Sequence, residues 1–278
     1  IVNMVPDNPV KAFFDENVLQ ILVFAFIFGM AVNMAGEKAK PVESFFQSLA
    51  AVMFKFAGII MMFAPYGIFA LLAWVLGQFG VAALLPLLQL VGVVYLGCAI
   101  FISVYYFGSL LLMRVNPFQF FKKIFSAFML AYTTSSSAAT LPQSIRCAEE
   151  NLKIDKSIAG FLLPLGATLN LNGLTIYITV ATIFAANVFG IHLHTSQLFT
   201  IGVTTVLAAM GAAAVPGSAL IVMGAVMGSV GIPLGAMPLI AGVDRLNDMA
   251  QTATNVTGDL FAAMVVAKTE PDAVLADD

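Results

Sequence analysis

Long apolar runs, separated by short polar segments, occupy most of this chain. About 20 helical residues are needed to cross the hydrocarbon core of a bilayer. Four runs approach or exceed that length, at residues 18–35, 45–76, 84–113 and 158–188. A fifth run, at residues 236–267, is as long but carries polar residues at helical spacing. This pattern predicts an all-α, polytopic membrane protein.

Two further apolar segments are interrupted near their middle by small residues. Residues 118–145 contain the run TTSSSAATLP, and residues 198–230 contain the run GAAAVPG. The positive-inside rule places the segments rich in Lys and Arg on the cytoplasmic side. It does so here only if residues 118–145 enter and leave on that side, and residues 198–230 enter and leave on the outer side. The sequence therefore predicts two re-entrant helical hairpins, inner and outer, which with the spans that follow them form an inverted repeat.

The last apolar run holds a stripe of polar side chains on one helical face. Ionisable groups inside a membrane face a protein interior or a wet cavity, because exposing them to lipid costs several kcal/mol. The alternative, a set of structural ion pairs, would need more cations than the single Arg245. At helical spacing, the polar residues that share roughly one third of the circumference are Asp244, Asp248, Gln251, Thr252, Asn255 and Asp259.

Composition supports the membrane class. The chain is 60% hydrophobic and 10% charged, with a mean hydropathy of +0.98, which is more apolar surface than a soluble domain of 278 residues can bury. The net charge of -3 and the lack of a basic patch argue against nucleic acid as a partner. Cys98 lies in an apolar run and Cys147 in a charged segment, so neither a disulfide framework nor a metal cluster is expected. Because the chain begins with Ile1 and shows no signal peptide, we expect it to be part of a longer protein.

An Asn-x-x-Gly motif follows each predicted hairpin. The first lies in ATLNLNG, which begins at Ala167, and the second in TATNVTG, which begins at Thr252. Glycine inside a span favours local unwinding, and the freed carbonyls with Asn and Asp oxygens suit a hard cation, while half-helix N-termini suit a carboxylate. One copy alone is as typical of helix packing by small residues. Two copies at matched positions, the second followed directly by Asp259, favour a binding site.

Five motifs in this order resemble the dicarboxylate/amino acid:cation symporter family, the glutamate-transporter homologues: NMVPDNP, SSSAATLP, PLGATLNLNG, GAAAVPG and NDMAQTATNVTGD. The resemblance covers the whole chain and implies that it is the C-terminal majority of such a protein. It implies a homotrimer in the plasma or inner membrane, in which a transport domain moves like an elevator against a scaffold. Residues 1–83 would then belong to the scaffold, and residues 84–278 to the transport domain with both hairpins.

The resemblance also assigns co-transported sodium ions to residues at matching positions. One sodium site is matched by Gly166, Asn170, Asn255 and Asp259. A second is matched by Thr168 and by the backbone near Ala209, Met210 and Ala212. A third site in the family uses an Asp where this chain has Asn172. Since an amide is neutral, we expect fewer coupled sodium ions than in relatives that carry the Asp.

A substrate pocket is implied in the same way. Asp248 matches the residue that takes the amino group of the substrate, and Asn255 matches a contact to its α-carboxylate. The remaining matched positions come from the two hairpins and the last span, and are Ser136, Ser137, Ala214, Gly217, Gln251 and Thr252.

Three positions depart from the family pattern. Members that take acidic substrates usually carry Arg where this chain has Gln251, and the usual Asn-Met-Asp-Gly-Thr is replaced by NLNGL, which ends at Leu174. Archaeal members carry Arg before the serine run, where this chain has Thr134. Arg245 is three residues from Asp248 on a helix and could pair with it instead.

These residues favour a sodium-driven symporter of a small neutral amino acid. Asp248 suits a substrate ammonium, and the neutral Gln251 would leave a second substrate carboxylate buried without a counter-charge. The alternative within the family is an acidic amino acid or C4-dicarboxylate symporter, coupled to sodium or protons. From other classes, an ion channel and an intramembrane protease would also carry intramembrane carboxylates. Asp244 and Asp248 lie on one helix and no histidine is near the serine run, so neither protease arrangement fits and no enzyme is expected.

Overall fold

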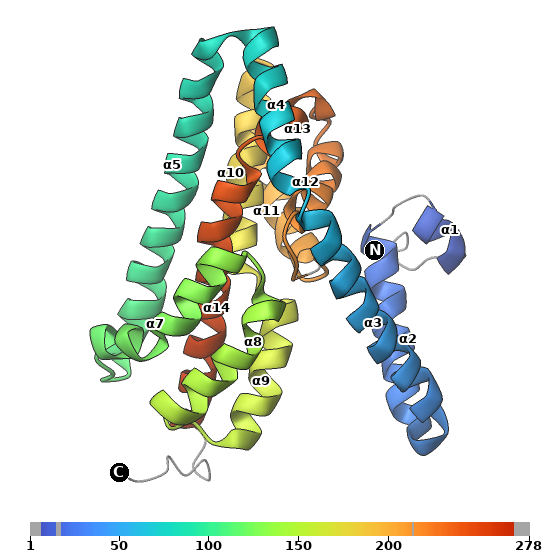
Figure 1. Ribbon diagram of the computed structural model, residues 1–278, viewed down its shortest axis with the longest axis vertical. Helices are drawn as coiled ribbons and strands as arrows, with labels where there is room; N and C mark the ends of the chain where they lie inside the picture. The colour runs from blue at the N-terminus through green and yellow to red at the C-terminus, as the bar shows by residue number, and fades with distance from the viewer. Residues whose placement is uncertain (1–6, 15–17, 213, 270–278) are drawn as a thin grey trace. The chain divides into compact units, whose positions relative to one another are not determined.

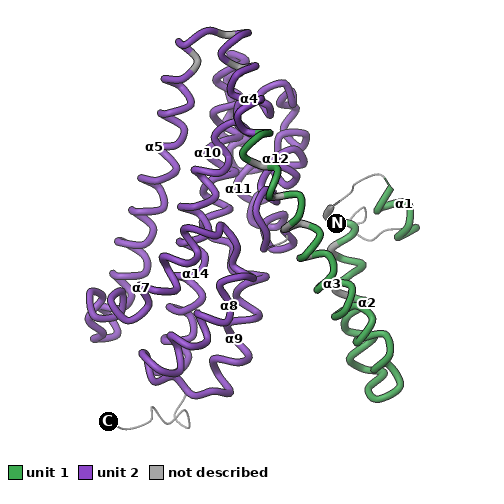
Figure 2. The backbone as a smooth tube through the Cα atoms, viewed as in Figure 1, with its two compact units in different colours: residues 1–67 green, residues 68–278 purple. Residues whose placement is uncertain are grey.

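The computed structural model describes residues 7–14, 18–212 and 214–269, and these are helical throughout apart from short connections (Figure 1). The start of the NMVPDNP motif and Ala213 of the GAAAVPG run lie outside the described residues. The chain divides into two compact units, residues 1–67 and residues 68–278 (Figure 2). The assignment of residues 1–83 to a scaffold and 84–278 to a transport domain stays a prediction.

The first unit holds two long helices. Its elements are α1 (Pro9–Phe14), α2 (Val18–Ala35), η2 (Gly36–Ala39), α3 (Lys40–Met61) and the start of α4 (Ala64–Phe79). The Asn8 side chain accepts hydrogen bonds from the first amides of α1, and Gly36 takes a positive φ of 57° just after α2, where glycine has no steric cost. Pro65 lies in the first turn of α4, so the predicted run at residues 45–76 is two helices.

The second unit is built around one buried helix, α14 (Asp244–Thr269). Every residue of α14 from 250 to 260 is buried, because this helix contacts α5, α7, α9 and α10 (Figure 1). Before it come α5 (Leu84–Ile100), the π-helical turn η4 (Phe101–Phe107), α6 (Gly108–Leu112), α7 (Pro117–Thr134), α8 (Ser137–Arg146), η5 (Cys147–Asn151), α9 (Lys156–Leu169), α10 (Asn172–Val188), α11 (Thr195–Ala209), α12 (Ser218–Ser229), η6 (Leu234–Ala236) and α13 (Met237–Ala241).

Two helical stretches among the described residues are long and apolar enough to cross a membrane. They are Leu84–Leu112, with 29 residues, and Lys156–Val188, with 33 residues, and they coincide with two of the five predicted runs. Shorter apolar helices lie at Pro65–Gln78, Thr195–Ala209 and Ser218–Ser229. The last two are the arms of the predicted outer hairpin, and each arm alone is too short to cross the hydrocarbon core.

Both segments predicted as hairpins consist of two helices packed against each other with a break between them. In the first, α7 ends where Ser135 adopts a left-handed conformation with φ 52°. Ser136 is extended and caps α8 by accepting a hydrogen bond from the Ala139 amide. In the second, α11 and α12 flank a break in which Gly217 has φ 82°. The helix breaks predicted at the two small-residue runs are thus present.

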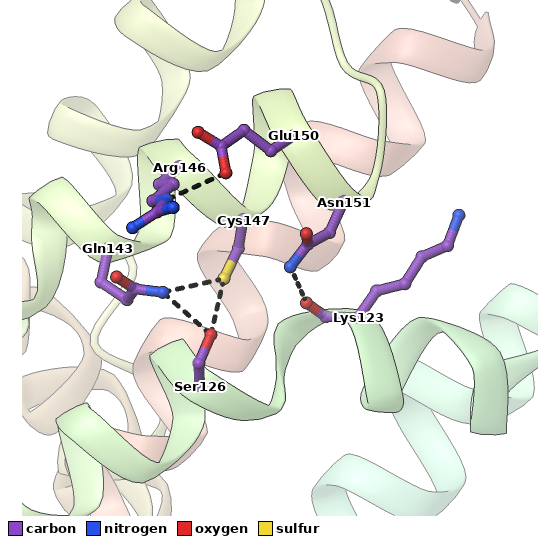
Figure 3. Close-up of polar contacts among 7 residues, drawn as sticks. All are labelled: Lys123, Ser126, Gln143, Arg146, Cys147, Glu150 and Asn151. Atoms are coloured by element: carbon purple, nitrogen blue, oxygen red, sulfur yellow. Dashed lines mark hydrogen bonds and ion pairs between the residues drawn. The ribbon is translucent and has the colours of Figure 1, made fainter. Parts of the chain in front are cut away.

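The far end of the first hairpin is fixed by side-chain contacts (Figure 3). Gln143 donates a hydrogen bond to the Ser126 hydroxyl at 2.9 Å, and that hydroxyl lies 3.2 Å from the sulfur of the buried Cys147. Asn151 donates to the Lys123 carbonyl at 2.7 Å. The two arms are therefore joined by side-chain contacts at the end of the hairpin away from the serine run.

The segment after this hairpin leads into α9, whose N-cap residue is Asp155. The Asp155 carboxylate accepts hydrogen bonds from the amide and hydroxyl of Ser157 at the beginning of α9. These donors stabilise the charged form and lower the pKa of Asp155 below its usual value. This is a polar surface cap of the kind expected at the start of a helix.

Candidate functional site

The polar stripe of α14 is buried and bonded to three other parts of the second unit. Asp259 contacts the break between α9 and α10, Asn255 contacts the start of α10, and Asp248 contacts the second hairpin. Asp248 and Asp259 are 3% and 4% exposed, yet neither forms an ion pair among the described residues. Buried carboxylates without a cationic partner are costly, which makes both of them candidates for binding a positively charged ligand.

The first Asn-x-x-Gly motif opens the backbone, as predicted. The helix stops at Leu169, Asn170 and Leu171 are non-helical, and α10 begins at Asn172. The Asn255 side-chain oxygen accepts a hydrogen bond of 2.7 Å from the Gly173 amide, which would otherwise bond within a continuous helix. A tertiary contact from α14 therefore stabilises the break.

The second Asn-x-x-Gly motif does not open, and here the predicted unwinding is wrong. The helix α14 is continuous from Asp244 to Thr269 and passes through Gly258. A methyl group on Gly258 would overlap the Tyr106 hydroxyl and come 2.6 Å from the Asn170 side-chain nitrogen. The glycine is thus needed for close approach of neighbouring groups and not for backbone freedom.

The four residues assigned to the first sodium site lie close together. Asn170 donates a hydrogen bond of 2.9 Å to the Asp259 carboxylate, and its amide donates to the Gly166 carbonyl at 2.7 Å. A methyl group on Gly166 would lie 2.6 Å from the same carboxylate. Asn255 is one turn before Asp259 on α14. One carboxylate, amide oxygens and backbone carbonyls form an oxygen-rich set of the kind that hard cations prefer, and its use as a sodium site stays a prediction.

Tyr106 also belongs to this cluster, although its place in an apolar run gave no sign of it. It lies in η4, is 1% exposed, and its hydroxyl accepts a hydrogen bond of 3.0 Å from the Asn172 side chain. The same Asn172 nitrogen donates to the Asn170 side-chain oxygen at 2.5 Å. The sequence signal that could have indicated this role is the hydroxyl group of a tyrosine inside an apolar run.

The second set of sodium residues is not connected in the same way. The Thr168 hydroxyl donates to the Leu165 carbonyl of its own helix at 2.8 Å. Ala209 and Ala212 are buried at the end of α11 and in the break that follows, while Met210 is exposed. Within the described part of the chain no hydrogen bond joins Thr168 to these residues, so this site stays a prediction.

The residues assigned to substrate surround a cavity of about 20 Å³ between the two hairpin breaks, α10 and α14. A volume of this size holds about one water molecule, and is too small for an amino acid or a dicarboxylate. The cavity is lined by Ser135, Ser137, Leu171, Leu174, Ala214, Val215, Ser218, Asp248, Gln251, Thr252 and Asn255.

Hydrogen bonds across the cavity keep it closed. The Ser136 hydroxyl donates to the Ala214 carbonyl at 3.0 Å, which joins the two hairpin breaks. The Asp248 carboxylate accepts from the Gly217 amide at 3.2 Å and from Gln251 at 2.6 Å. All eight predicted substrate residues therefore line the cavity or bond to a residue that does, while their role in binding stays a prediction.

Arg245 does not pair with Asp248, contrary to the expectation. Its guanidinium donates to the Thr134 carbonyl at 3.2 Å, at the C-terminal end of α7 where the helix dipole attracts a cation. It does not line the cavity. Arg245 thus joins α14 to the first hairpin, and Asp248 is left to the neutral donors around it.

Gly166, Gly173 and Gly258 let these elements approach one another, and Gly173 is the most constrained of the three. A methyl group there would meet the Gln251 carbonyl oxygen and lie 2.6 Å from the Gln251 Cα, and backbone atoms of a buried helix cannot yield. Overpacking of this kind costs about 1–3 kcal/mol or more. We expect Gly173→Ala to lower the thermal stability of the purified protein clearly. Gly160→Ala, whose methyl would meet nothing within 4 Å on the exposed side of α9, is the control and should change it little. Equal melting temperatures for the two variants would contradict this packing.

The chain belongs to the Sodium:dicarboxylate symporter family, whose sequence profile matches residues 1–269. The resemblance predicted from the five motifs is therefore confirmed. This is a family of transporters and not of enzymes.

Similar proteins are named as transporters of glutamate, aspartate or C4-dicarboxylates. The chain is 40% identical over 269 residues to the proton/sodium-glutamate symport protein of Geobacillus stearothermophilus, covering 97% of this chain and 64% of that protein. It is 36% identical to the proton/glutamate-aspartate symporter of Bacillus subtilis (strain 168), with 97% and 65% covered. It is also 36% identical to the C4-dicarboxylate transport protein of Pseudomonas syringae pv. syringae (strain B728a), with 96% and 60% covered. The chain thus spans less than two thirds of the length of these relatives.

Proposed function

We propose that this protein is a cation-coupled symporter of an acidic amino acid or a C4-dicarboxylate, embedded in the cell membrane. The observation that carries the proposal is the closed polar cavity beside the Asp259–Asn170 cluster, with Asn255 belonging to both. Relatives at 35–40% identity are named as proton- or sodium-coupled symporters of glutamate and aspartate, or as C4-dicarboxylate transporters. Their names favour this substrate class over the neutral amino acid expected from the sequence.

The geometry around the cavity suits an anionic substrate. Ser137, the first residue of α8, lines the cavity, and Asn172 begins α10 just beyond the lining residue Leu171. Two helix N-termini thus lie near the cavity, where backbone amides and the positive ends of the helix dipoles favour a carboxylate.

Substrate exchange requires the hairpin breaks to separate, because the closed cavity holds about one water molecule. The outer hairpin, residues 198–230, would act as the extracellular lid, and the inner hairpin, residues 118–145, as its inward counterpart. In the proposal both are re-entrant, residues 84–278 carry the substrate by an elevator movement, and residues 1–83 belong to the scaffold of a homotrimer.

A bulky side chain at the lid should prevent closure. Ala214 lies in the break of the second hairpin, and its carbonyl accepts the hydrogen bond from Ser136 in the first break. Ala214→Trp is expected to weaken both substrate and sodium binding about ten-fold or more, since it removes the closed state in which both are held. Equilibrium binding of radiolabelled substrate, with and without sodium, measures this.

The matched control is Ile221→Trp, which adds a large side chain to a 68% exposed position of α12. It should leave both affinities near those of the wild type. Unchanged binding by Ala214→Trp would remove the lid role of the second hairpin.

A second candidate substrate class, small neutral amino acids such as serine or alanine, is favoured by one contact. The Gln251 side-chain nitrogen donates a hydrogen bond to Asp248 at 2.6 Å, so the cavity holds an amide where acidic-substrate members usually carry Arg. A neutral amide offers no counter-charge to a second substrate carboxylate. This contact is the reason to keep the neutral class as an outcome of the test.

The test is uptake by proteoliposomes under imposed gradients. Radiolabelled aspartate, glutamate, succinate and serine are each offered with an inward sodium gradient, an inward proton gradient, or neither. Saturable, gradient-driven uptake of aspartate, glutamate or succinate supports the proposal, and uptake of serine alone supports the second candidate. A current or flux that does not saturate with substrate would instead indicate a channel and overturn both.

A further inference from the structure

A continuous chain of hydrogen bonds links Tyr106 to Asp259. Asp259 accepts from Asn170 at 2.9 Å, Asn170 accepts from Asn172 at 2.5 Å, and Tyr106 accepts from Asn172 at 3.0 Å. The chain joins η4, the break between α9 and α10, and α14, so it spans three separate elements of the second unit. Both of its ends, Tyr106 and Asp259, are buried.

When Asp259 is ionised, the direction of every bond in this chain follows from it. A carboxylate accepts and does not donate, so Asn170 must present its NH₂ group to it. Asn170 then has only its oxygen to offer to Asn172, which must answer with its own NH₂ group. The second hydrogen of that group leads to the Tyr106 oxygen. With Asp259 ionised, the orientation of both amides is therefore dictated chemically and does not depend on how amide oxygens and nitrogens are assigned.

A cation at Asp259 would reverse this order. A cation repels the NH₂ group of Asn170 and attracts its oxygen, so the amide must turn over. Its NH₂ group would then face the NH₂ group of Asn172, which must turn as well and present its oxygen. That oxygen needs a donor on its other side, where Tyr106 lies.

Tyr106 is the one member of the chain that can accept in one state and donate in the other without changing its place. Among the described residues its own hydroxyl hydrogen has no acceptor, so it is free to rotate toward Asn172. Gly258 provides the room, because a side chain there would overlap the Tyr106 hydroxyl. Asn172 is equally required, since an Asp at this position could only accept.

We propose that Tyr106, Asn172 and Asn170 form a reversible hydrogen-bond relay whose direction is set by whether a cation occupies Asp259. The three side chains are positioning residues that adjust the affinity of the cation site and transmit its occupancy to η4 and α5. The proposal rests on the cation-coupled function above. It adds a role for Asn172 as an internal NH₂ donor that holds the cation-free state together.

The first test is vibrational. Purified protein is titrated with sodium chloride, with choline chloride as the salt control, and the Raman Fermi doublet of tyrosine is recorded, because its intensity ratio distinguishes a hydroxyl that accepts from one that donates. Subtracting the spectrum of Tyr106→Phe isolates Tyr106. Tyr105→Phe is the matched control, since Tyr105 is the exposed neighbour in the same π-helical turn. We expect the Tyr106 component to change from acceptor to donor with sodium, and a component that stays an acceptor at saturating sodium overturns the relay.

The second test is binding. Asn172→Asp cannot donate to Asn170, so it forces the orientation that suits a cation. It should raise the apparent sodium affinity measured by thermal shift by about ten-fold or more without raising the number of sodium ions bound. A rise that comes with an additional bound sodium ion reflects a carboxylate at the family's third site and overturns the relay. An affinity equal to that of the wild type, in a variant that still unfolds cooperatively, overturns the relay. If sodium stabilises neither protein, the relay is overturned as well, while proton-coupled uptake still decides the proposed function independently.

Discussion

Asp259→Asn is expected to abolish the sodium response of this protein. Among the described residues, Asp259 is the one carboxylate bonded to the unwound segment at Asn170, and it is 4% exposed. Removing one partner of a buried charge pair leaves the other without compensation, which costs about 3–5 kcal/mol. Since 1.4 kcal/mol is ten-fold, sodium affinity should fall by about 100-fold or more. Thermal shift against sodium concentration and uptake under a sodium gradient both measure it.

The amide is nearly isosteric and can still accept the hydrogen bond from Asn170, so a loss of binding without loss of folding is the expected outcome. Asp155→Asn is the matched control, because it neutralises an exposed carboxylate at the start of α9 that has no contact with the cluster. It should keep the wild-type sodium response. If Asp259→Asn keeps that response too, the cation does not bind at Asp259.

The sequence predicted the helix breaks well where the local residues dictate them. The serine run predicted a break inside the first hairpin, and the structure places it at Ser135 and Ser136 because a left-handed residue followed by a hydroxyl N-cap is a local solution for ending one helix and starting another. Here the residues that break the helix are themselves in the break.

Tertiary contacts decide which of the two Asn-x-x-Gly motifs unwinds, and local sequence does not contain them. The two Asn-x-x-Gly motifs look equivalent, but only the first opens, because Asn255 supplies the Gly173 amide with an acceptor from another helix. The second stays helical because its glycine makes room for Tyr106 and Asn170. Tyr106 is 64 residues away from Asn170 in sequence (170 − 106), and nothing in an apolar run marks such a partner.

The cavity residues also divide into those that the sequence predicted and those that depend on tertiary packing. Its members on α14 were predicted from helical spacing, Ser137 and Ala214 of the hairpins were assigned by resemblance, and the structure brings both sets together. The other lining residues were not predicted, and they are Ser135, Leu171, Leu174, Val215 and Ser218. Arg245 was expected at Asp248 because spacing on one helix permits it. The Thr134 carbonyl at the end of α7 binds it instead, and only the packing of α7 on α14 makes that carbonyl available.

Gln251→Arg is expected to shift substrate preference toward aspartate and glutamate. Gln251 is 3% exposed and lines the cavity, its nitrogen bonds to Asp248 at 2.6 Å, and its oxygen has no partner among the described residues. A guanidinium here could bind a second substrate carboxylate in a bidentate manner. A charge-assisted hydrogen bond contributes about 1.5–3 kcal/mol, so the affinity for aspartate relative to serine should rise about 10-fold to 100-fold. Competition of radiolabelled uptake by both amino acids measures the ratio.

Gln251→Glu places a negative charge at the position where Gln251→Arg places a positive one. It should lower the aspartate-to-serine ratio, because a second carboxylate in the cavity would repel the side chain of an acidic substrate. Asp248 is unchanged in both variants, so recognition of the substrate ammonium is retained and only the contact to the other end of the substrate differs. Opposite shifts in the two variants would make residue 251 the determinant of specificity. If the wild type already prefers aspartate and neither variant changes the ratio, another group binds the second carboxylate, and the neutral-substrate candidate is excluded.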